Sequence, residues 1–338
     1  MKPAELTVFT EPISAEGTTQ QVRSFFRPLK FALQGKTPPP RKKYGGHYAV
    51  TRSLLEGLKK TGIDFNYNPS RKKDIAGNVI VLAGVERLQK LIELKQQGKI
   101  KILFAGPNIC ESPLEEDDLL TNLAIDKCIV PSGWIKTFFI QEQQTLKDRV
   151  EIWHAGVDTE YWKRSIQDKP SKVILYWKTE GEEFYHAIKD VIRQYGYEPV
   201  TINYGNYSLP EYKEALNKSL FAVFVSRSES QGIAMAEAWS MDVPVYAWDP
   251  GKLDYKNRDY REVTSCPYLT NEVGLKWTDI HQLKDILEGT RKGIFSFQPR
   301  QYAIRLFADE QTSTALVNKF RHHSGTTLAS GFVNAKMN

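Results

Sequence analysis

The stretch FAVFVSRSESQGIAMAEAWSMDVPVYAW, residues 221–248, contains the signals of a strand, a turn, a helix and a second strand. Residues 221–225 form an apolar run with the length and composition of a buried strand. The turn reaches Gly232, and IAMAEAWSM then continues without glycine or proline, as a short helix does. VPVYAW supplies the next apolar strand. This order of elements predicts a unit of a parallel sheet with a helix packed on its face.

The same alternation runs through most of the chain. Strands are expected at residues 6–10, 64–68, 78–84, 99–106, 127–132, 150–156, 172–177, 199–205 and 243–248, and helices at 47–60, 85–98, 132–147, 182–195 and 210–218. A polar stretch at Thr159–Lys172, which contains Pro170, interrupts this rhythm and reads as a linker. The sequence therefore predicts an α/β protein with two successive doubly wound sheets. Ligands of such sheets bind beyond the carboxyl ends of the strands.

Length and composition agree with two globular domains. The chain has 338 residues, 41% of them hydrophobic and 25% charged, and single cores stop growing near ~250–300 residues. We find no run of ~20 apolar residues that could span a bilayer, and no apolar signal core in the first residues. The three cysteines (Cys110, Cys128 and Cys266) are widely spaced and odd in number. Reduced thiols and a cytoplasmic location are expected.

The net charge is +6, which raises the question of nucleic acid. The basic residues are dispersed, however, and the densest runs, Arg41–Lys43 and Arg71–Lys73, are short. We therefore expect no nucleic-acid partner. Peripheral contact with anionic lipid headgroups, binding of phosphorylated substrates and simple solvation all remain compatible with this charge.

The opening stretch also has the groups that a nucleotide sugar needs. Gly232 removes a side chain where the backbone must approach a ligand. The amides of Gly232, Ile233 and Ala234 lie at a helix amino terminus, which attracts anions. Glu229 and Glu237 place a carboxylate on either side of these amides. A phosphate on the amides would have hydroxyl-rich groups next to both carboxylates, as in ribose–diphosphate–hexose.

Residues 229–237 resemble the E-x₇-E signature of retaining GT-B glycosyltransferases. Further blocks resemble the same family in the same order: YGGHYAVTRSLLEGLKKTG (44–62), IVPSGWIKTFF (129–139), WHAGVDTEYW (153–162), VPVYAWDPG (243–251) and QYAIRLFADEQTSTALVNKF (301–320). The resemblance thus covers most of residues 44–320.

The resemblance implies a GT-B fold, in which two Rossmann-like domains face a cleft. Residues 1–158 would form the acceptor-side domain and residues 159–300 the nucleotide-sugar domain. Residues 301–338 would form a helix that crosses back to the first domain, followed by a tail. It also implies a hexosyltransferase-type enzyme that retains the anomeric configuration and needs neither a metal nor a cofactor. The partners would be a nucleotide sugar and a glycan or lipid-linked acceptor.

The donor-side roles are carried over from the family residue by residue. Glu237 would bind the ribose, and Glu229 would contact the transferred sugar as a catalytic residue. Gln231 would belong to the same donor-binding turn. The family usually holds the diphosphate with two basic residues after the first strand of the second domain. Here LYWKTEGEEF (175–184) offers Lys178 alone, and Arg227 is a candidate for the missing charge.

Tyrosines and first-domain residues complete the candidate site. Tyr204 and Tyr207 are candidates to stack on a nucleobase, with packing as the alternative. Asn108 in FAGPNIC stands where many relatives have a histidine and is a candidate catalytic group, although Gly-Pro-Asn is also a favourable turn. Gly45, Gly46 and His47 are the expected acceptor-side residues.

Two other features are expected to be structural. His154 reads as a packed strand histidine. The acidic run Glu115–Asp118 reads as a solvated helix start rather than a metal site. Two alternatives to the transferase stay open: a GT-B module that binds without catalysis, and a GT-B-like sugar-nucleotide epimerase.

Overall fold

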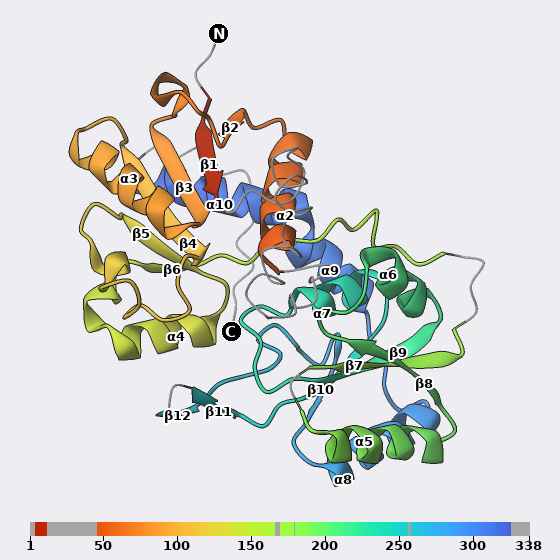
Figure 1. Cartoon of the computed structure of the whole chain (residues 1–338). Helices are drawn as coiled ribbons and strands as arrows, with labels where there is room; N and C mark the ends of the chain where they lie inside the picture. The colour runs from red at the N-terminus through yellow and green to blue at the C-terminus, as the bar shows by residue number, and fades with distance from the viewer. Residues whose placement is uncertain (1–3, 12–45, 166–169, 179, 256–257, 326–338) are drawn as a thin grey trace, which may run out of the picture.

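The computed structural model describes residues 4–11, 46–165, 170–178, 180–255 and 258–325. These residues form two α/β domains with a waist between them (Figure 1). From the sequence we expect acceptor specificity to lie in first-domain loops such as Glu11–Tyr44; apart from Glu11 this stretch lies outside the described residues, and so does Gly45.

The first domain is built on a parallel sheet. In its described part, six strands are ordered β2-β1-β3-β4-β5-β6. They are β1 (Leu6–Thr10), β2 (Phe65–Tyr67), β3 (Asn78–Ala83), β4 (Ile102–Asn108), β5 (Lys127–Val130) and β6 (Val150–Ile152). The helices are α2 (Gly46–Lys60), α3 (Val85–Gln96) and α4 (Gly133–Glu142), and short 3-10 turns occupy Lys72–Asp74, Leu119–Thr121 and Gln144–Leu146.

The second domain repeats the plan with five described parallel strands in the order β13-β10-β9-β7-β8. They are β7 (Lys172–Trp177), β8 (Glu198–Asn203), β9 (Ser219–Val225), β10 (Val245–Trp248) and β13 (Gly274–Trp277). The helices are α5 (Glu182–Gln194), α6 (Leu209–Asn217), α7 (Ile233–Ser240) and α8 (Ile280–Arg291). The predicted fold class, two doubly wound parallel sheets, is confirmed.

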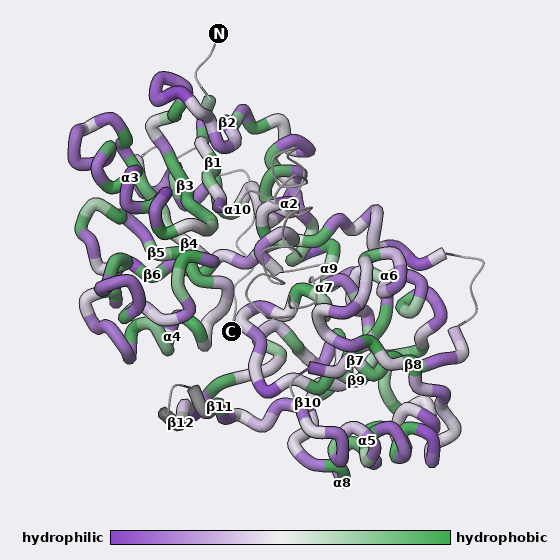
Figure 2. Tube along the Cα trace, viewed as in Figure 1, coloured by the Kyte–Doolittle hydropathy of each residue, from purple (hydrophilic) through white to green (hydrophobic). Residues whose placement is uncertain are grey.

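Both sheets are buried on both faces, which explains why their strands are nearly continuous apolar runs. In β3, residues 79–83 are all buried, and in β9 so are residues 221–225. Figure 2 shows hydrophobic colour along the strands and hydrophilic colour on the outer helices. Burial of these strands and of the apolar stripes of the helices forms the core of each domain.

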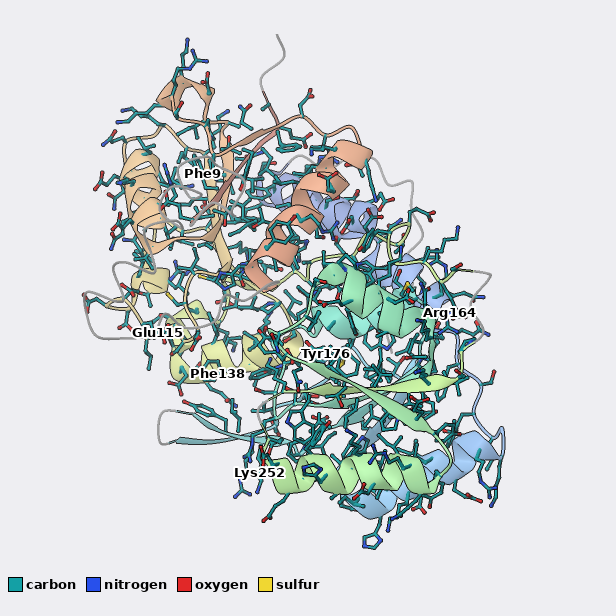
Figure 3. The ribbon with its side chains drawn as sticks, turned by 45° about the vertical axis from the view of Figure 1, so that its right-hand side comes forward. Phe9, Glu115, Phe138, Arg164, Tyr176 and Lys252 are labelled. Atoms are coloured by element: carbon teal, nitrogen blue, oxygen red, sulfur yellow. The ribbon has the colours of Figure 1, made fainter. Side chains whose placement is uncertain are left out.

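An antiparallel hairpin leaves the second domain after β10. Its strands are β11 (Lys252–Tyr255) and β12 (Arg258–Arg261). It lies beside α4 of the first domain, where the Tyr260 ring packs edge-on against Phe138 with centroids 5.0 Å apart (Figures 1 and 3). The Tyr260 hydroxyl also donates to Glu142 Oε1 at 3.1 Å. The sequence analysis did not anticipate this hairpin.

The carboxyl-terminal segment connects the two domains. Residues 301–320, which we expected as one crossing helix, belong to two helices: α9 (Pro299–Phe307) and α10 (Asp309–His323). Between them Ala308 has an extended backbone and forms a parallel bridge with Val157. α9 packs on α7 of the second domain, whereas α10 packs on α2 of the first. The C-terminal segment therefore returns from the second domain to the first at Ala308.

Polar contacts fix this crossing. The Arg52 guanidinium donates to the buried Asp309 carboxylate at 2.9 Å. Burial raises the pKa of Asp309, and Arg52 opposes that rise. Gly156 N donates to Ser53 Oγ at 2.7 Å, and Trp153 Nε1 donates to Thr312 O at 2.8 Å. These hydrogen bonds thus connect three segments: α2, the residues after β6, and α10.

Two loops differ from the expectation. Residues 115–118 do not begin an α-helix; Glu116, Asp117 and Asp118 have positive φ angles and lead into the 3-10 turn at Leu119–Thr121. Gly-Pro-Asn at 106–108 is the end of strand β4 rather than a turn outside it. Hydrogen bonds across the sheet prevailed over the local turn preference there.

Gly57 provides a test of the crossing. A Cβ at this α2 position would collide with the main-chain oxygen of Asp309 and with Ser313 on α10. Gly57→Ala should lower the free energy of unfolding by about 1–3 kcal/mol, as overpacking does, although alanine is the better helix former. Gly133→Ala is the control, because its Cβ would have no neighbour within 4 Å. Chemical denaturation measures both; equal stability of the two variants would contradict the packing described.

Candidate functional site

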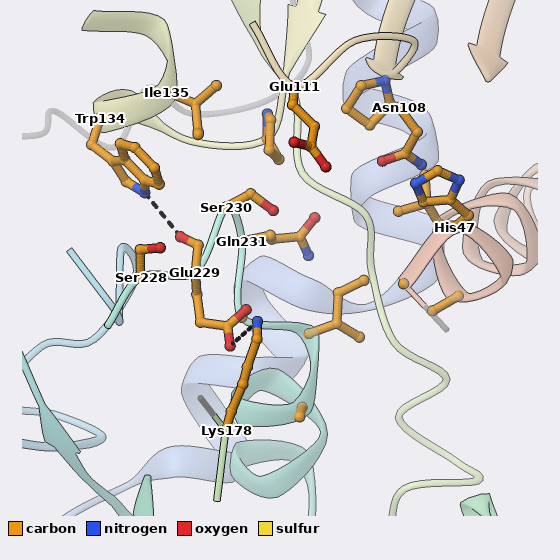
Figure 4. A pocket seen from close by; sticks show the side chains of 18 of the residues that line it. His47, Asn108, Glu111, Trp134, Ile135, Lys178, Ser228, Glu229, Ser230 and Gln231 are labelled. Carbon is orange, nitrogen blue, oxygen red and sulfur yellow. Dashed lines mark hydrogen bonds and ion pairs between the residues drawn. The ribbon is translucent and has the colours of Figure 1, made fainter. Parts of the chain in front are cut away.

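A cavity of about 1030 Å³ lies between the domains, at the carboxyl ends of strands from both sheets (Figure 4). Its first-domain wall comes from the start of α2, the end of β4 and α4. Its second-domain wall comes from the ends of β7 and β9, the turn at 228–232 and α7. This is where a parallel α/β sheet is expected to bind ligands.

The turn after β9 positions the start of α7. The Ser226 hydroxyl, almost fully buried, donates to Ser228 O at 3.0 Å. Gly232 has a φ angle of +81° and precedes the first residue of α7. A side chain at this left-handed position would be strained, which explains the glycine. The amides of Ile233 and Ala234, which also line the cavity, lie at a positive helix end.

Glu237 lies one turn further along α7 and lines the cavity with only 1% of its surface exposed. Two tyrosines of the same core lie close to it. Burial, followed by the Glu237 carboxylate, raises the pKa of Tyr207. Burial also raises the pKa of Tyr212, whose hydroxyl donates to Ala234 O at 2.8 Å. Both phenols stay neutral near pH 7, and the carboxylates of Glu237 and Glu229 both lie close to Tyr207.

Lys178 and Glu229 form an ion pair in the cavity. Lys178 directly follows β7, and its Nζ lies 2.8 Å from Glu229 Oε1, with side-chain exposures of 19% and 17%. The Lys178 ammonium also lies over the Tyr204 ring, 4.4 Å from its centroid. An incoming phosphate would therefore compete with Glu229 for this cation.

Two donor-side candidates make contacts that the sequence did not indicate. The amide of Gln231, 6% exposed, accepts from Ala155 N at 2.9 Å and donates to Ala155 O at 2.8 Å. Gln231 therefore ties the turn to the segment between the domains, although it also lines the cavity. Arg227 does not contribute to the cavity wall among the described residues; it pairs with Glu180 at 2.6 Å.

The first-domain candidates lie opposite Lys178 and Glu229. Gly46 and His47 are the first residues of α2, and both line the cavity. Asn108 ends β4 and lines it as well (Figure 4). Within the described part of the chain, its buried Nδ2 has no hydrogen-bond partner. A buried amide donor without a partner is costly, which fits a ligand acceptor at this position.

Sequence analysis missed the apolar wall of the cavity. Trp134, Ile135 and Phe138 of α4 line it, together with Leu253 and Tyr260 of the hairpin. Trp134 Nε1 donates to the main-chain oxygen of Glu229 at 2.9 Å, across the two domains. The available signal was the block IVPSGWIKTFF, which is too rich in large apolar residues for a helix with one buried face.

His154 and Cys128 lie outside the described cavity wall, and His154 is packed as expected, although it follows β6 (Val150–Ile152) rather than lying in a strand. Burial lowers the pKa of His154 to about 4, and its ring packs on Tyr268 and Phe307. It is a packed, neutral histidine. Burial also raises the pKa of Cys128 to about 12, which makes this thiol unreactive at neutral pH.

No group of three or more His, Cys, Asp or Glu side chains in the described ranges is arranged to hold a metal ion. In the same ranges, no helix has the length and apolar character needed to cross a bilayer.

The sequence matches no protein-family model and no curated protein. Solved structures do match. The apo form of the lipopolysaccharide outer core galactosyltransferase WaaB aligns with a TM-score of 0.54 and 14% identity, over 94% of this chain and 99% of that one. Anabaena HepE in complex with UDP has a TM-score of 0.56 and 12% identity, over 94% and 99%. Sucrose-phosphate synthase from Thermosynechococcus elongatus has a TM-score of 0.50 and 12% identity, over 95% and 100%.

These alignments extend over both domains. At such low identity they define the fold and leave the activity open. The chain has the GT-B fold, with two parallel Rossmann-like domains that face a cleft.

Binding of a diphosphate in the cavity is predicted to depend on Lys178. Among the described residues of the cavity wall it is the only lysine or arginine, so a bound diphosphate should depend on it strongly. Lys178→Ala should weaken binding of nucleoside diphosphate by about 1.5–3 kcal/mol, the range for hydrogen bonds to charged groups. Lys172→Ala is the control, because Lys172 begins the same strand and pairs with exposed Glu198 at 3.1 Å. Calorimetric titration with UDP, GDP and ADP measures both; equal affinities would remove Lys178 from the site.

Proposed function

We propose that this chain is a retaining glycosyltransferase that moves a sugar from a nucleoside diphosphate sugar to an acceptor hydroxyl. The observation that carries the proposal is the second-domain wall of the cavity. There the amino terminus of α7, the Lys178–Glu229 pair and the buried Glu237 carboxylate converge on one space. We infer that the helix end binds the diphosphate, Glu237 the ribose and Glu229 the transferred sugar.

Two further features support this placement of the nucleotide sugar in the cavity. Tyr204 lies over Lys178 with 42% of its surface exposed, so a face of its ring is available to a nucleobase next to the phosphate cation. HepE, which shares the fold, was solved with UDP. A nucleotide bound in this way would leave its sugar directed toward Glu229 and the first-domain wall.

The chemistry requires stabilisation of a departing diphosphate. The bond between the anomeric carbon and the phosphate oxygen breaks, and the acceptor oxygen forms the new bond on the same face. The acceptor proton passes to the leaving phosphate oxygen. Preorganised amides of α7 and the Lys178 ammonium would stabilise the developing charge. Once Lys178 turns to the phosphate, the Glu229 carboxylate is available to the sugar hydroxyls.

The first domain would supply the acceptor side. Asn108, with its buried Nδ2, is proposed to hold a sugar oxygen near the reacting carbon. His47 and Gly46 would contact the acceptor at the start of α2. The described cavity wall carries four glutamates (Glu111, Glu115, Glu229 and Glu237) against one lysine. This charge balance favours acceptor groups with hydroxyls over strongly anionic groups.

We propose a reaction without a metal or cofactor in glycan or glycolipid synthesis. We also propose a cytoplasmic enzyme whose net charge of +6 supports peripheral contact with anionic membrane. A non-catalytic binding module remains the second candidate, because Lys178 stands without a second cation in the described cavity wall.

Substitution of Glu237 and of Glu229 should have different effects on binding and turnover. Glu237→Gln should weaken binding of both the nucleoside diphosphate and the nucleotide sugar by about 1.5–3 kcal/mol, because the ribose occurs in both. Glu229→Gln should leave nucleoside diphosphate affinity unchanged or slightly higher, because it frees Lys178, while turnover falls. Calorimetry measures binding, and release of nucleoside diphosphate from UDP-glucose, GDP-mannose and ADP-glucose measures turnover in excess EDTA.

Each candidate function predicts its own outcome. A transferase loses turnover in Glu229→Gln while the nucleotide still binds. A binding module shows no turnover in the wild type and no requirement for Glu229. An epimerase converts the nucleotide sugar without releasing nucleoside diphosphate as the main product. Turnover that disappears with EDTA and returns with magnesium or manganese would contradict the metal-free reaction.

A further inference from the structure

Trp134 connects the first domain to the glutamate on the opposite wall. It lies in the first turn of α4 and lines the cavity. Its indole Nε1 donates to the main-chain oxygen of Glu229 at 2.9 Å, as the dashed line in Figure 4 shows. The donor-binding turn is thus held by a side chain from the other domain.

Two other hydrogen bonds of Glu229 lie within its own domain. Its main-chain N–H donates to Thr264 O at 3.1 Å, and its carboxylate accepts from Lys178. Residues 226–232 belong to neither a helix nor a strand. Individual hydrogen bonds therefore determine where this backbone lies, and Trp134 supplies one directly at Glu229.

We propose that Trp134 is a positioning residue for sugar transfer. It acts through the Glu229 main chain and sets the carboxylate against the transferred sugar when the two domains are together. This inference rests on the proposed function. It adds that α4, an acceptor-side helix, controls the geometry of a donor-side glutamate. A small displacement of such a group is enough to slow a reaction strongly.

The nucleotide half of the donor should not depend on Trp134. Its proposed partners, Lys178, the α7 amides and Glu237, all belong to the second domain. Loss of the indole bond should therefore change turnover and leave nucleoside diphosphate affinity unchanged. A purely structural role would instead lower stability, nucleotide affinity and turnover together.

The matched pair Trp134→Phe and Trp248→Phe tests this. Each keeps an aromatic ring and removes one indole bond to a main-chain oxygen. Trp248 Nε1 donates to Thr278 O at 3.0 Å within the second domain, away from the described cavity wall. Trp134→Phe should lower kcat for UDP-glucose, GDP-mannose or ADP-glucose, whichever is turned over, by about tenfold. Trp248→Phe should leave kcat unchanged, and both should keep wild-type affinity for nucleoside diphosphate.

A double-mutant cycle with Glu229→Gln shows whether Trp134 acts through Glu229. If it does, adding Trp134→Phe to Glu229→Gln should lower kcat by less than twofold, because the group that is positioned has already been lost. Full additivity, a Trp134→Phe enzyme as fast as Trp248→Phe, or a parallel fall in nucleotide affinity would overturn the proposal.

Hydrogen–deuterium exchange separates this inference from the proposed function. Trp134→Phe should raise amide exchange in residues 226–232 alone, and Trp248→Phe should not. A rise throughout both domains would indicate a structural role, and no rise would show that Trp134 does not hold the turn; either overturns the proposal. If none of the three nucleotide sugars binds or reacts, the proposed function fails, whereas the exchange result still decides whether Trp134 holds the turn.

Discussion

The direction of the strands is the constraint on which the cavity depends. All strands of each main sheet are parallel, so every carboxyl end, with its loop and helix start, meets at one edge. Two such edges form a cleft only if the domains face each other. The crossing at Ala308 and the buried Arg52–Asp309 pair hold α10 on the first domain while α9 remains on the second. The packing of α2 on α10 therefore helps to keep the two walls of the cavity facing each other, although these helices meet outside it.

Charge within the cleft determines what it can bind. The helix dipole of α7 and Lys178 attract an anion, whereas Glu229 and Glu237 accept hydroxyl donors. A group with phosphate at its centre and hydroxyls at both ends satisfies all of these. Lys178 pairs with Glu229 at 2.8 Å, so under the proposed function the phosphate of a nucleotide would replace Glu229 as the partner of this lysine. Part of the binding energy would be used in that exchange, and the Glu229 carboxylate would become available to the transferred sugar.

Much of the fold could be predicted from the sequence because parallel strands buried on both faces give short, continuous apolar runs. The turn around Gly232 could also be predicted, because a glycine directly before a helix often has a backbone conformation that other residues avoid. Trp134 was not recognised as a site residue, because its bond to Glu229 joins positions 95 residues apart. The hairpin at 252–261 was missed because each of its strands has only four residues and about half of these are charged. The break at Ala308 was missed because alanine favours a helix, and only the bridge to Val157 explains the extended conformation.

The most direct test of the central claim is a calorimetric titration of the wild-type chain with UDP, GDP, ADP and their nucleotide sugars. The account predicts saturable 1:1 binding of at least one nucleoside diphosphate and of its sugar conjugate, and weaker binding of both in Glu237→Gln by about 1.5–3 kcal/mol. Failure of every nucleotide to bind, or binding that is unaffected by Glu237→Gln, would contradict it.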